Sequence, residues 1–186
     1  MRILIISDTH GSLPEVQTVI ERESKDKAID LVLHAGDVLY HGPRNPLPGG
    51  YTPADLASYL SRLPDIRYVR GNCDSDVDQM VLEAKEMPRT ALIQIGNLKI
   101  HMNHGDRMHE DERVQAAESE GADLTISGHT HVSVLKRSAN QIVLNPGSTA
   151  LPKDGTKSYA LLADGWIQLK AVDDGRILAS IEIGAD

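Results

Sequence analysis

The sequence predicts an α/β protein in which two β-sheets pack together and helices cover their outer faces. Aliphatic runs alternate with helical segments through the first half of the chain, as expected for buried parallel strands joined by helices. The last third consists mostly of short strand-like runs separated by turns, which predicts a meander. Because no internal repeat and no linker-like stretch divides the chain, we expect one domain over residues 1–186.

The first half of the chain supplies strands and helices in alternation. The aliphatic run that begins at Arg2 predicts a buried strand, and Ser12 with Pro14 near the first turn is typical of a helix start. Thr52 followed by Pro53 marks a second helix start in the same way. The expected strands are 2–7, 29–34 and 66–69, the expected helices are 12–24 and 52–63, and a short helix or coil precedes Pro88.

The second half is richer in strands. Gly96-Asn97 between two aliphatic runs predicts a hairpin, and Gly121 is expected to cap the C-terminus of a helix. The expected helix is 110–120, and the expected strands are 91–95, 98–102, 123–127, 132–137, 141–144, 158–162, 166–172 and 176–183.

Composition excludes several classes of protein. A chain of 186 residues with 40% hydrophobic residues can bury a substantial core. The net charge of −8 and the lack of a basic stripe disfavour a nucleic-acid partner. The single cysteine, Cys73, cannot form an intramolecular disulfide, which is compatible with a reducing compartment. With no signal-peptide core and no apolar run of membrane-spanning length, we expect a cytoplasmic protein without a membrane partner.

Polar side chains follow five of the expected strands. Asp37 ends the apolar run that starts at Leu31, and Gly36 before it permits close approach of the backbone. Five strand ends that offer Asp, His and Asn are typical of the shell of a metal centre. The candidate residues at these ends are Asp8, His10, Asp37, Asn72, Asp74, His104, His129 and His131.

Each of these blocks also has a simpler explanation when it is taken alone. Gly71-Asn72-Cys73-Asp74 suits a turn, because Asn and Gly favour left-handed conformations. A lone histidine is more often a hydrogen-bonded core residue or a solvated surface residue than a ligand. We keep this simpler explanation for His34, His41, His101 and His109.

Together, and in this order, the blocks resemble the signature of the calcineurin-like metallophosphoesterases: Asp-x-His, Gly-Asp, Gly-Asn-x-Asp, His-Gly and Gly-His-x-His. Tyr40-His41-Gly42-Pro43-Arg44-Asn45, Gly71-Asn72-Cys73-Asp74 and Asn145-Pro146-Gly147-Ser148 are similar to the small bacterial YfcE-like phosphodiesterases. The resemblance covers nearly the whole chain. It implies a four-layer sandwich of two mixed β-sheets flanked by helices.

The resemblance implies two divalent metal ions per chain. One ion would be bound by Asp8, His10, Asp37 and His131, and the other by Asp37, Asn72, His104 and His129. Carboxylate, imidazole and amide oxygen together suit Mn²⁺, Fe²⁺, Co²⁺, Ni²⁺ or Zn²⁺, and the family implies Mn²⁺. The shared carboxylate of Asp37 would keep the ions about 3.5–4 Å apart, the spacing that clamps a phosphoryl group.

The implied activity is that of a phosphoric diester hydrolase on a small-molecule phosphodiester, with attack by a hydroxide that bridges the two ions. Asp37, Asn72 and His104 are catalytic candidates, and so is Asp74, as a residue that orients its neighbours. Cys73 stands where many members of the superfamily carry a histidine that protonates the leaving oxygen. Because general acid catalysis is worth about 10²–10⁴-fold, we expect activity on diesters with good leaving groups and weak activity on alkyl monoesters.

Two other functions stay open. A phosphomonoesterase or nucleotide phosphatase would use the same metal ions, and a non-catalytic interaction scaffold is possible because a retromer subunit shares this fold. Retention of all seven ligand positions disfavours the scaffold. The exposed edges expected of a meander favour a homo-oligomer, either a dimer or a tetramer.

Two further positions lie outside the implied ligand sets. Residues 41–50 contain three prolines and three glycines and predict a shaped loop. Arg44 in this loop either contacts a substrate phosphate or is simply solvated. Relatives often carry a histidine where Asp106 stands, so no family role transfers to that position.

Overall fold

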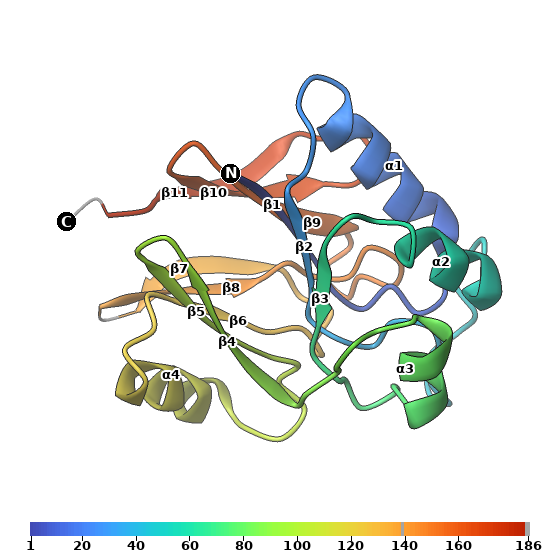
Figure 1. The fold of residues 1–186 in the computed structure, drawn as a ribbon, viewed down its shortest axis with the longest axis horizontal. Helices are drawn as coiled ribbons and strands as arrows, with labels where there is room; N and C mark the ends of the chain where they lie inside the picture. The colour runs from blue at the N-terminus through green and yellow to red at the C-terminus, as the bar shows by residue number, and fades with distance from the viewer. Residues whose placement is uncertain (139, 185–186) are drawn as a thin grey trace.

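The structure is a computed structural model that describes residues 1–138 and 140–184, and it has four layers (Figure 1). Its elements are β1 (Arg2–Ile6), α1 (Leu13–Ser24), β2 (Leu31–His34), α2 (Pro53–Leu60), β3 (Ile66–Tyr68), α3 (Asp76–Val81), β4 (Thr90–Ile95), β5 (Leu98–Asn103), α4 (Glu110–Ser119), β6 (Leu124–Ile126), β7 (Val134–Ser138), β8 (Gln141–Asn145), β9 (Ser158–Ala163), β10 (Trp166–Ala171) and β11 (Ile177–Glu182). A six-stranded sheet in the order β11-β10-β9-β1-β2-β3 faces a five-stranded sheet in the order β4-β5-β6-β8-β7. The predicted sandwich of two mixed sheets flanked by helices is therefore confirmed. The expected single domain extends over positions 139, 185 and 186, which lie outside the described residues.

The alternation of side chains along β1 shows why residues 3–6 of this strand are all aliphatic. Ile3 and Ile5 point into the core between the sheets, whereas Leu4 and Ile6 pack in the layer that contains α1 and α2. A strand buried on both faces reads as a continuous apolar run, which is the pattern that predicted it. β1 pairs in parallel with β2 and antiparallel with β9, so it lies at the centre of its sheet.

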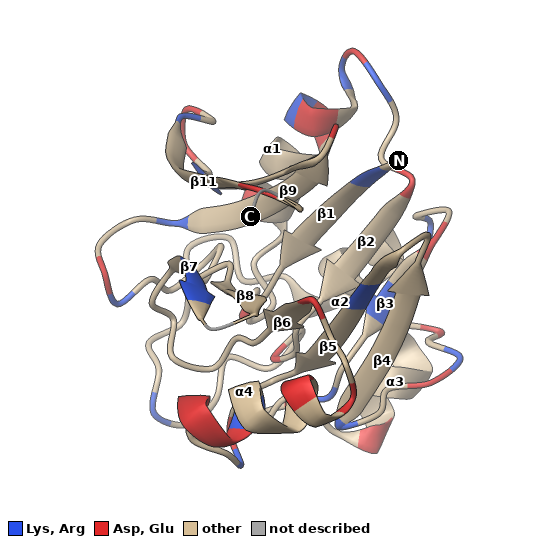
Figure 2. Ribbon diagram, turned by 90° about the vertical axis from the view of Figure 1, so that its left-hand side faces the viewer, with Lys and Arg blue, Asp and Glu red and all other residues tan. Residues whose placement is uncertain are grey.

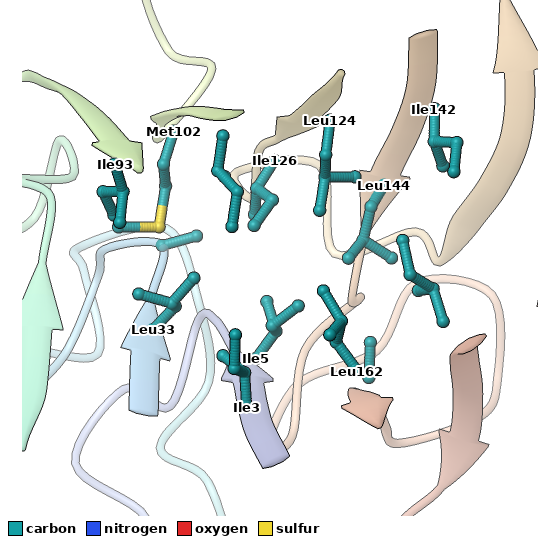
Figure 3. Close-up of a cluster of buried hydrophobic side chains, with 14 of the residues drawn as sticks. Ile3, Ile5, Leu33, Ile93, Met102, Leu124, Ile126, Ile142, Leu144 and Leu162 are labelled. Carbon is teal, nitrogen blue, oxygen red and sulfur yellow. The ribbon is translucent and has the colours of Figure 1, made fainter. Parts of the chain in front are cut away.

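The main core fills the space between the two sheets (Figure 3). Side chains of the five-stranded sheet, such as Met102 and Leu144, face side chains of the six-stranded sheet, such as Ile5 and Leu162. All of these side chains are buried, and burial of each contributes roughly 1.5–3 kcal/mol relative to exposure. This core fixes the two sheets against each other and therefore fixes the relative positions of their strand ends.

Helices cover both outer faces. Val16 and Val19 of α1 and Leu56 and Leu60 of α2 pack on the outer face of the six-stranded sheet. On the other side α4 contacts β6 and buries Ala117. The first turn of α4 is acidic, which complements the helix dipole, and its charges colour the helix red in Figure 2. Within the described residues, no helix has the length and apolarity needed to cross a membrane.

One prediction of connectivity is wrong. The last five strands do not form a single meander, because the β7–β8 hairpin belongs to the five-stranded sheet, where β8 pairs with β6 in parallel. Only β9, β10 and β11 form an antiparallel meander, and it pairs with β1. All five residues of β8 are buried, so its place in the sheet is set by tertiary packing that neighbouring residues in the sequence do not reveal.

The two sheets present their strand ends at a common place. β1, β2 and β3 run parallel in one sheet, and β5, β6 and β8 run parallel in the other. Ser148 Oγ donates to the backbone oxygen of Asp8 (2.6 Å) and so joins the two sheets at these ends. Asn145 Nδ2 donates to the backbone oxygen of Gly128 (2.8 Å) within the five-stranded sheet. The Asn145–Ser148 segment thus braces the loops that carry the candidate ligands.

Candidate metal centre

All seven candidate ligands lie on loops that follow the carboxyl ends of strands. Asp8 and His10 follow β1, Asp37 follows β2 and Asn72 follows β3, whereas His104 follows β5 and His129 and His131 follow β6. Each sheet therefore contributes part of the group. The sequence predicted this convergence from strand ends alone, and the structure brings the side chains together.

Five of these seven positions have a left-handed backbone, which L-residues with a side chain rarely adopt. Their φ angles are 52° for Asp8, 43° for His10, 57° for Asp37, 69° for His129 and 58° for His131. Each such conformation destabilises the fold by on the order of 1–3 kcal/mol and persists only where the surrounding structure enforces it. Strained backbone of this kind is typical of functional sites. No pattern in the sequence predicted the left-handed backbone at these positions.

Glycines permit the close packing of these loops. A Cβ atom at Gly71 would overlap the carboxylate of Asp37, and one at Gly128 would overlap Ser7 Oγ and lie 2.7 Å from Asp8 Oδ2. The glycines that precede Asn72 and His129 are therefore required by steric space, in addition to any turn that they form.

Three imidazoles are oriented by their Nδ1 atoms. Because a carbonyl oxygen only accepts hydrogen bonds, each of these Nδ1 atoms carries a proton, and each Nε2 atom is the ring nitrogen directed into the centre. The bonds join His10 Nδ1 to the oxygen of Tyr40 (2.8 Å), His104 Nδ1 to that of Ala35 (2.7 Å) and His131 Nδ1 to that of Leu151 (2.6 Å).

The Nε2 atoms meet each other and two buried carboxylates. His10 Nε2 lies 3.1 Å from His131 Nε2, and His131 Nε2 lies 3.2 Å from Asp8 Oδ1. His104 Nε2 lies 3.4 Å from Asp37 Oδ2. Two imidazole lone pairs that face each other at this distance repel unless a proton or a metal ion lies beside them. The donor set of imidazole nitrogen and carboxylate oxygen therefore fits a first-row divalent cation.

Two buried atoms in this cluster also lack a hydrogen-bond partner among the described residues. They are Asp8 Oδ1 and His104 Nε2, and both belong to side chains that solvent does not reach. A buried carboxylate oxygen without a hydrogen-bond partner destabilises the fold by on the order of several kcal/mol. Its presence here therefore indicates a bound partner. Divalent cations bound at the centre would provide partners for these two atoms.

Among the residues that the structure describes, three groups of side chains could hold a cation, each with ligand atoms within 4.8 Å of one another. Asp8 joins His10 and His131 in one group, and Asp8 joins Asp37 and His104 in a second. In the third group, Asp37 and His10 lie beside the thiol of Cys73. The proximity of Cys73 to His10 was not expected from the sequence. Burial and the charge of Asp37 raise the pKa of this thiol to about 12, so it is neutral in the metal-free protein.

Asn72 and His129 form a pair of their own at the more exposed side of the cluster. His129 Nδ1 lies 2.7 Å from Asn72 Oδ1, and the backbone nitrogen of His129 donates to Asp8 Oδ2 (3.0 Å). The backbone nitrogen of Cys73 donates to Asp37 Oδ1 (2.8 Å), so Oδ2 is the oxygen of Asp37 that faces His104.

Asp74 lies behind the centre and faces the backbone of its neighbours. Its carboxylate accepts hydrogen bonds from the nitrogens of Asp37 (2.8 Å), Val38 (2.8 Å) and Gly71 (2.7 Å). Burial raises its pKa to about 6 although these bonds favour the charged form. Asp74 thus connects the loop of Asp37 to the loop of Asn72, which is the geometry of an orienting residue.

The charges within the cluster compensate one another when no cation is bound. Burial opposes ionisation of Asp37, but the adjacent His104 outweighs it and holds the pKa of the carboxyl well below its usual range. Burial likewise opposes protonation of His104, but the Asp37 carboxylate raises the pKa of this imidazole to about 9. A bound cation would take the place of that proton.

The centre opens into a cavity of about 820 Å³. The cavity is bordered by the loop that contains Arg44 and by the loop that contains Lys153. Sequence reasoning overlooked Thr130, although it stands between two candidate ligands, and Lys153, for which no motif gave a signal. The lining residues are Asp37, Tyr40, Gly42, Pro43, Arg44, Asn45, Asn72, Cys73, His129, Thr130, His131 and Lys153.

The remaining histidines belong to none of the metal-binding groups described above. His34 is fully buried, where its Nδ1 accepts from the nitrogen of Gly36 (3.2 Å) and its Nε2 lies 3.0 Å from Thr9 Oγ1. His41 packs edge-on against two tyrosines, His101 lies 3.7 Å from Glu120, and His109 precedes α4 as its N-cap.

Two mixed sheets with a cluster of Asp and His side chains at their strand ends define the class of protein. A model of the calcineurin-like phosphoesterase superfamily domain matches residues 1–164, and the chain belongs to this superfamily. It is 36% identical over 185 residues to phosphodiesterase YfcE of Escherichia coli K12, with 98% of each chain covered. It is also 30% identical over 168 residues to the probable metallophosphoesterase YsnB of Bacillus subtilis, covering 87% of this chain and 83% of the relative.

Solved structures agree with this assignment. The structure of the Escherichia coli phosphoesterase YfcE superposes with a TM-score of 0.87 at 33% identity, over 98% of this chain and 100% of that one. A structure of Vps29 from Entamoeba histolytica complexed with zinc gives a TM-score of 0.69 at 22% identity, over 98% of this chain and 99% of that one. The second likeness concerns the fold alone.

Proposed function

We propose that the protein is a metal-dependent phosphodiesterase. The proposal is carried by the cluster in which the Nε2 atoms of His10, His104 and His131 face the carboxylates of Asp8 and Asp37. Two buried atoms of this cluster form no hydrogen bond with any described residue. Membership in the phosphoesterase superfamily supports the reaction class, and the likeness to a phosphodiesterase of Escherichia coli supports the diester substrate.

The proposed centre contains two divalent cations. Asp8, His10, Asp37 and His131 would bind one ion, and Asp37, Asn72, His104 and His129 the other. Mn²⁺ is the proposed ion, and Zn²⁺, Fe²⁺, Co²⁺ and Ni²⁺ suit the same ligands. When bound, the ions would lower the pKa of the attacking water and neutralise the negative charge of the phosphoryl oxygens.

The protein itself positions these ligands and shapes the reaction. Asp74 fixes the backbone of Asp37, and the backbone nitrogen of Cys73 fixes one oxygen of the same carboxylate. The Cys73 thiol lies at the cavity wall, and a thiol is a poorer general acid for the leaving oxygen than an imidazole. Substrates whose leaving group needs no protonation, such as aryl diesters, are therefore preferred.

A comparison of a diester with a monoester of one leaving group tests the function. Bis(p-nitrophenyl) phosphate and p-nitrophenyl phosphate are assayed with Mn²⁺ and with Zn²⁺, and the metal content of the purified protein is measured. We expect metal-stimulated release of p-nitrophenolate from the diester, with kcat/KM at least about tenfold above that for the monoester. A preference for the monoester would support the phosphatase alternative, and no release with any divalent ion would support a scaffold.

Cys73→Ala tests the assignment of the thiol. We expect this variant to retain turnover of the aryl diester within a few fold, because an aryl leaving group does not need a proton. The matched comparison is Asp37→Ala, which should abolish turnover. A loss in Cys73→Ala as large as that in Asp37→Ala would show that the thiol is essential.

Oligomeric state and location remain predictions. The strands at the sheet edges, β3, β4, β7 and β11, each have one unpaired side in the described residues, which supports the proposed dimer or tetramer. In Figure 2 the Lys and Arg residues are scattered over the loops and strands, which agrees with a small-molecule substrate and disfavours nucleic acid. A cytoplasmic location is proposed from the sequence.

A further inference from the structure

Two basic side chains share the cavity with the proposed metal ligands. Arg44 comes from the loop before α2, and Lys153 comes from the loop between β8 and β9. Both residues are exposed, and among the described residues neither forms an ion pair. The chain as a whole has a net charge of −8, and within the described part of the chain Asp37 is the only carboxylate that lines the cavity. The wall around the centre is therefore positive although the protein is acidic.

The loop that carries Arg44 is braced from several sides. Asn45 Nδ2 donates to the backbone oxygen of His41 (2.8 Å), and Ser12 Oγ donates to that of Gly49 (2.6 Å). The ring of His41 packs edge-on between two tyrosine rings, with centroids 4.8 Å and 5.4 Å away. The scaffold that presents Arg44 is thus built into the fold, which distinguishes this residue from an arginine on an unsupported loop.

Lys153 is placed next to a proposed ligand by its own backbone. Its nitrogen donates to the backbone oxygen of His131 (2.9 Å). The following residue, Asp154, anchors the loop by accepting from the nitrogen (2.8 Å) and the hydroxyl (2.7 Å) of Ser133. The side chain of Lys153 therefore projects into the cavity from a segment that is bound to the metal-binding loop.

We propose that Arg44 and Lys153 form a subsite for a second anionic group of the substrate, in addition to the ester that reacts. The inference rests on the proposed phosphodiesterase function. Bound cations would neutralise the reacting phosphoryl group, so two further cationic side chains in the cavity exceed what that group requires. Arg binds phosphate through paired hydrogen bonds and Lys through a compact charge, and the two together match a terminal phosphate.

The size of the cavity supports a substrate larger than a simple diester. Cavities of about 300–1,000 Å³ hold ligands of nucleotide or drug size, and this one measures about 820 Å³. Tyr40, whose exposed fraction is 42%, offers an aromatic face on the same lining for an organic moiety. The substrate class is therefore a phosphodiester that also carries a phosphomonoester.

Two substrates that differ only in the second anion test the subsite. One is the p-nitrophenyl 5′-phosphodiester of thymidine, and the other is the same compound with a phosphate on its 3′-hydroxyl. Release of p-nitrophenolate reports the reacting diester in both. We expect kcat/KM of the wild type to be at least about tenfold higher for the phosphorylated compound, mainly through a lower KM, because hydrogen bonds to charged groups are worth this much.

Charge-removing variants locate the effect. In Arg44→Gln and Lys153→Gln the ratio of the two kcat/KM values should fall toward one, and the double variant should abolish the preference. Arg62→Gln and Lys27→Gln are the matched controls, because both residues are exposed and neither lines the cavity, so the ratio should stay at the wild-type value. Equal kcat/KM for the two substrates in the wild type, or a preference that survives in the double variant, would overturn the subsite.

A binding measurement separates the subsite from the proposed function. Thymidine 3′,5′-bisphosphate and thymidine 5′-monophosphate are titrated calorimetrically into the Mn²⁺-loaded protein, with no turnover required. The bisphosphate should bind at least about tenfold more tightly, and the double variant should bind both equally. If neither diester reacts but the bisphosphate still binds more tightly, the proposed phosphodiesterase activity is contradicted and the subsite is supported. Equal binding of the two nucleotides by the wild type would contradict the subsite.

Discussion

Individual residues at the centre have conformations and buried atoms that destabilise the fold unless a ligand is bound. Asp8 has a left-handed backbone, a fully buried side chain and an oxygen that accepts no hydrogen bond from the described residues. His104 is buried, its Nδ1 atom is bound to a backbone carbonyl, and its Nε2 atom lies 3.4 Å from Asp37 Oδ2 but forms no hydrogen bond with the described residues. Such residues destabilise the fold when they are considered singly. Their accumulation within a few ångströms therefore argues for a cation more directly than any one motif does.

His34 gives a prediction of pH dependence at the residue scale. Burial lowers its pKa from 6.5 to about 3, and its two ring nitrogens are engaged by Thr9 and Gly36. The unfolded chain therefore binds a proton at this imidazole that the folded chain does not, so the free energy of unfolding falls as pH drops from about 6.5 toward 3. The slope from this residue approaches about 1.4 kcal/mol per pH unit.

His34→Asn removes the titrating group and keeps an acceptor near the nitrogen of Gly36. Urea unfolding of the wild type and the variant is compared at pH 7 and pH 4.5. Between pH 7 and pH 4.5, the free energy of unfolding of the wild type should fall by about 2–3 kcal/mol more than that of the variant. Parallel pH profiles would show that His34 is not held neutral in the folded protein.

Short connections between elements determine how the metal ligands are spaced. Arg89, immediately before β4, donates from Nη1 to the backbone oxygen of Gly71 (3.0 Å) and lies 3.6 Å from Asp106 Oδ2. Gly71 precedes Asn72 on the loop after β3, and Asp106 follows His104 on the loop after β5. Arg89 therefore links two ligand loops that belong to different sheets. Asp106 thus has a structural contact in this chain.

Arg89→Ala should weaken metal binding without unfolding the protein. Loss of a contact that orients metal ligands costs about 10–100-fold in affinity, and the partly exposed position of Arg89 favours the lower end of this range. The apparent dissociation constant for Mn²⁺ is measured by competition with a chromophoric chelator. Arg89→Lys should lie between Arg89→Ala and the wild type. Arg67→Ala is the control, since the side chain of Arg67 pairs with Asp65 on the surface. Unchanged affinity in Arg89→Ala would refute the link.

At the scale of the whole molecule, local patterns predicted most of the elements and missed how some of them pair. Strands such as β1 were predictable because burial on both faces leaves a continuous aliphatic run. The placement of β8 beside β6 was not, because it depends on which buried faces meet in three dimensions. The candidate ligands were predictable as polar residues at strand ends. The left-handed backbone of His131, the approach of Cys73 to His10 and the place of Lys153 had no local signal.

Metal binding should stabilise the entire fold, because the centre joins loops from both sheets. A ligand present at a hundred times its dissociation constant adds about 2.7 kcal/mol to the free energy of unfolding. For a chain of this length that corresponds to a rise in Tm of about 5–10 °C. Calorimetry with Mn²⁺ and with a chelator checks this. Equal Tm values would contradict a metal centre that bridges the two sheets.

The number of metal ions bound per chain tests the central claim most directly. Mn²⁺ is counted by elemental analysis after equilibrium dialysis of the wild type, Asp37→Asn and His131→Ala. The wild type should bind two ions, Asp37→Asn should lose both because the two sites share this carboxylate, and His131→Ala should mainly lose one. Equal loss from the two variants would contradict the shared ligand, and a wild type that binds fewer than two ions would contradict the dinuclear centre itself.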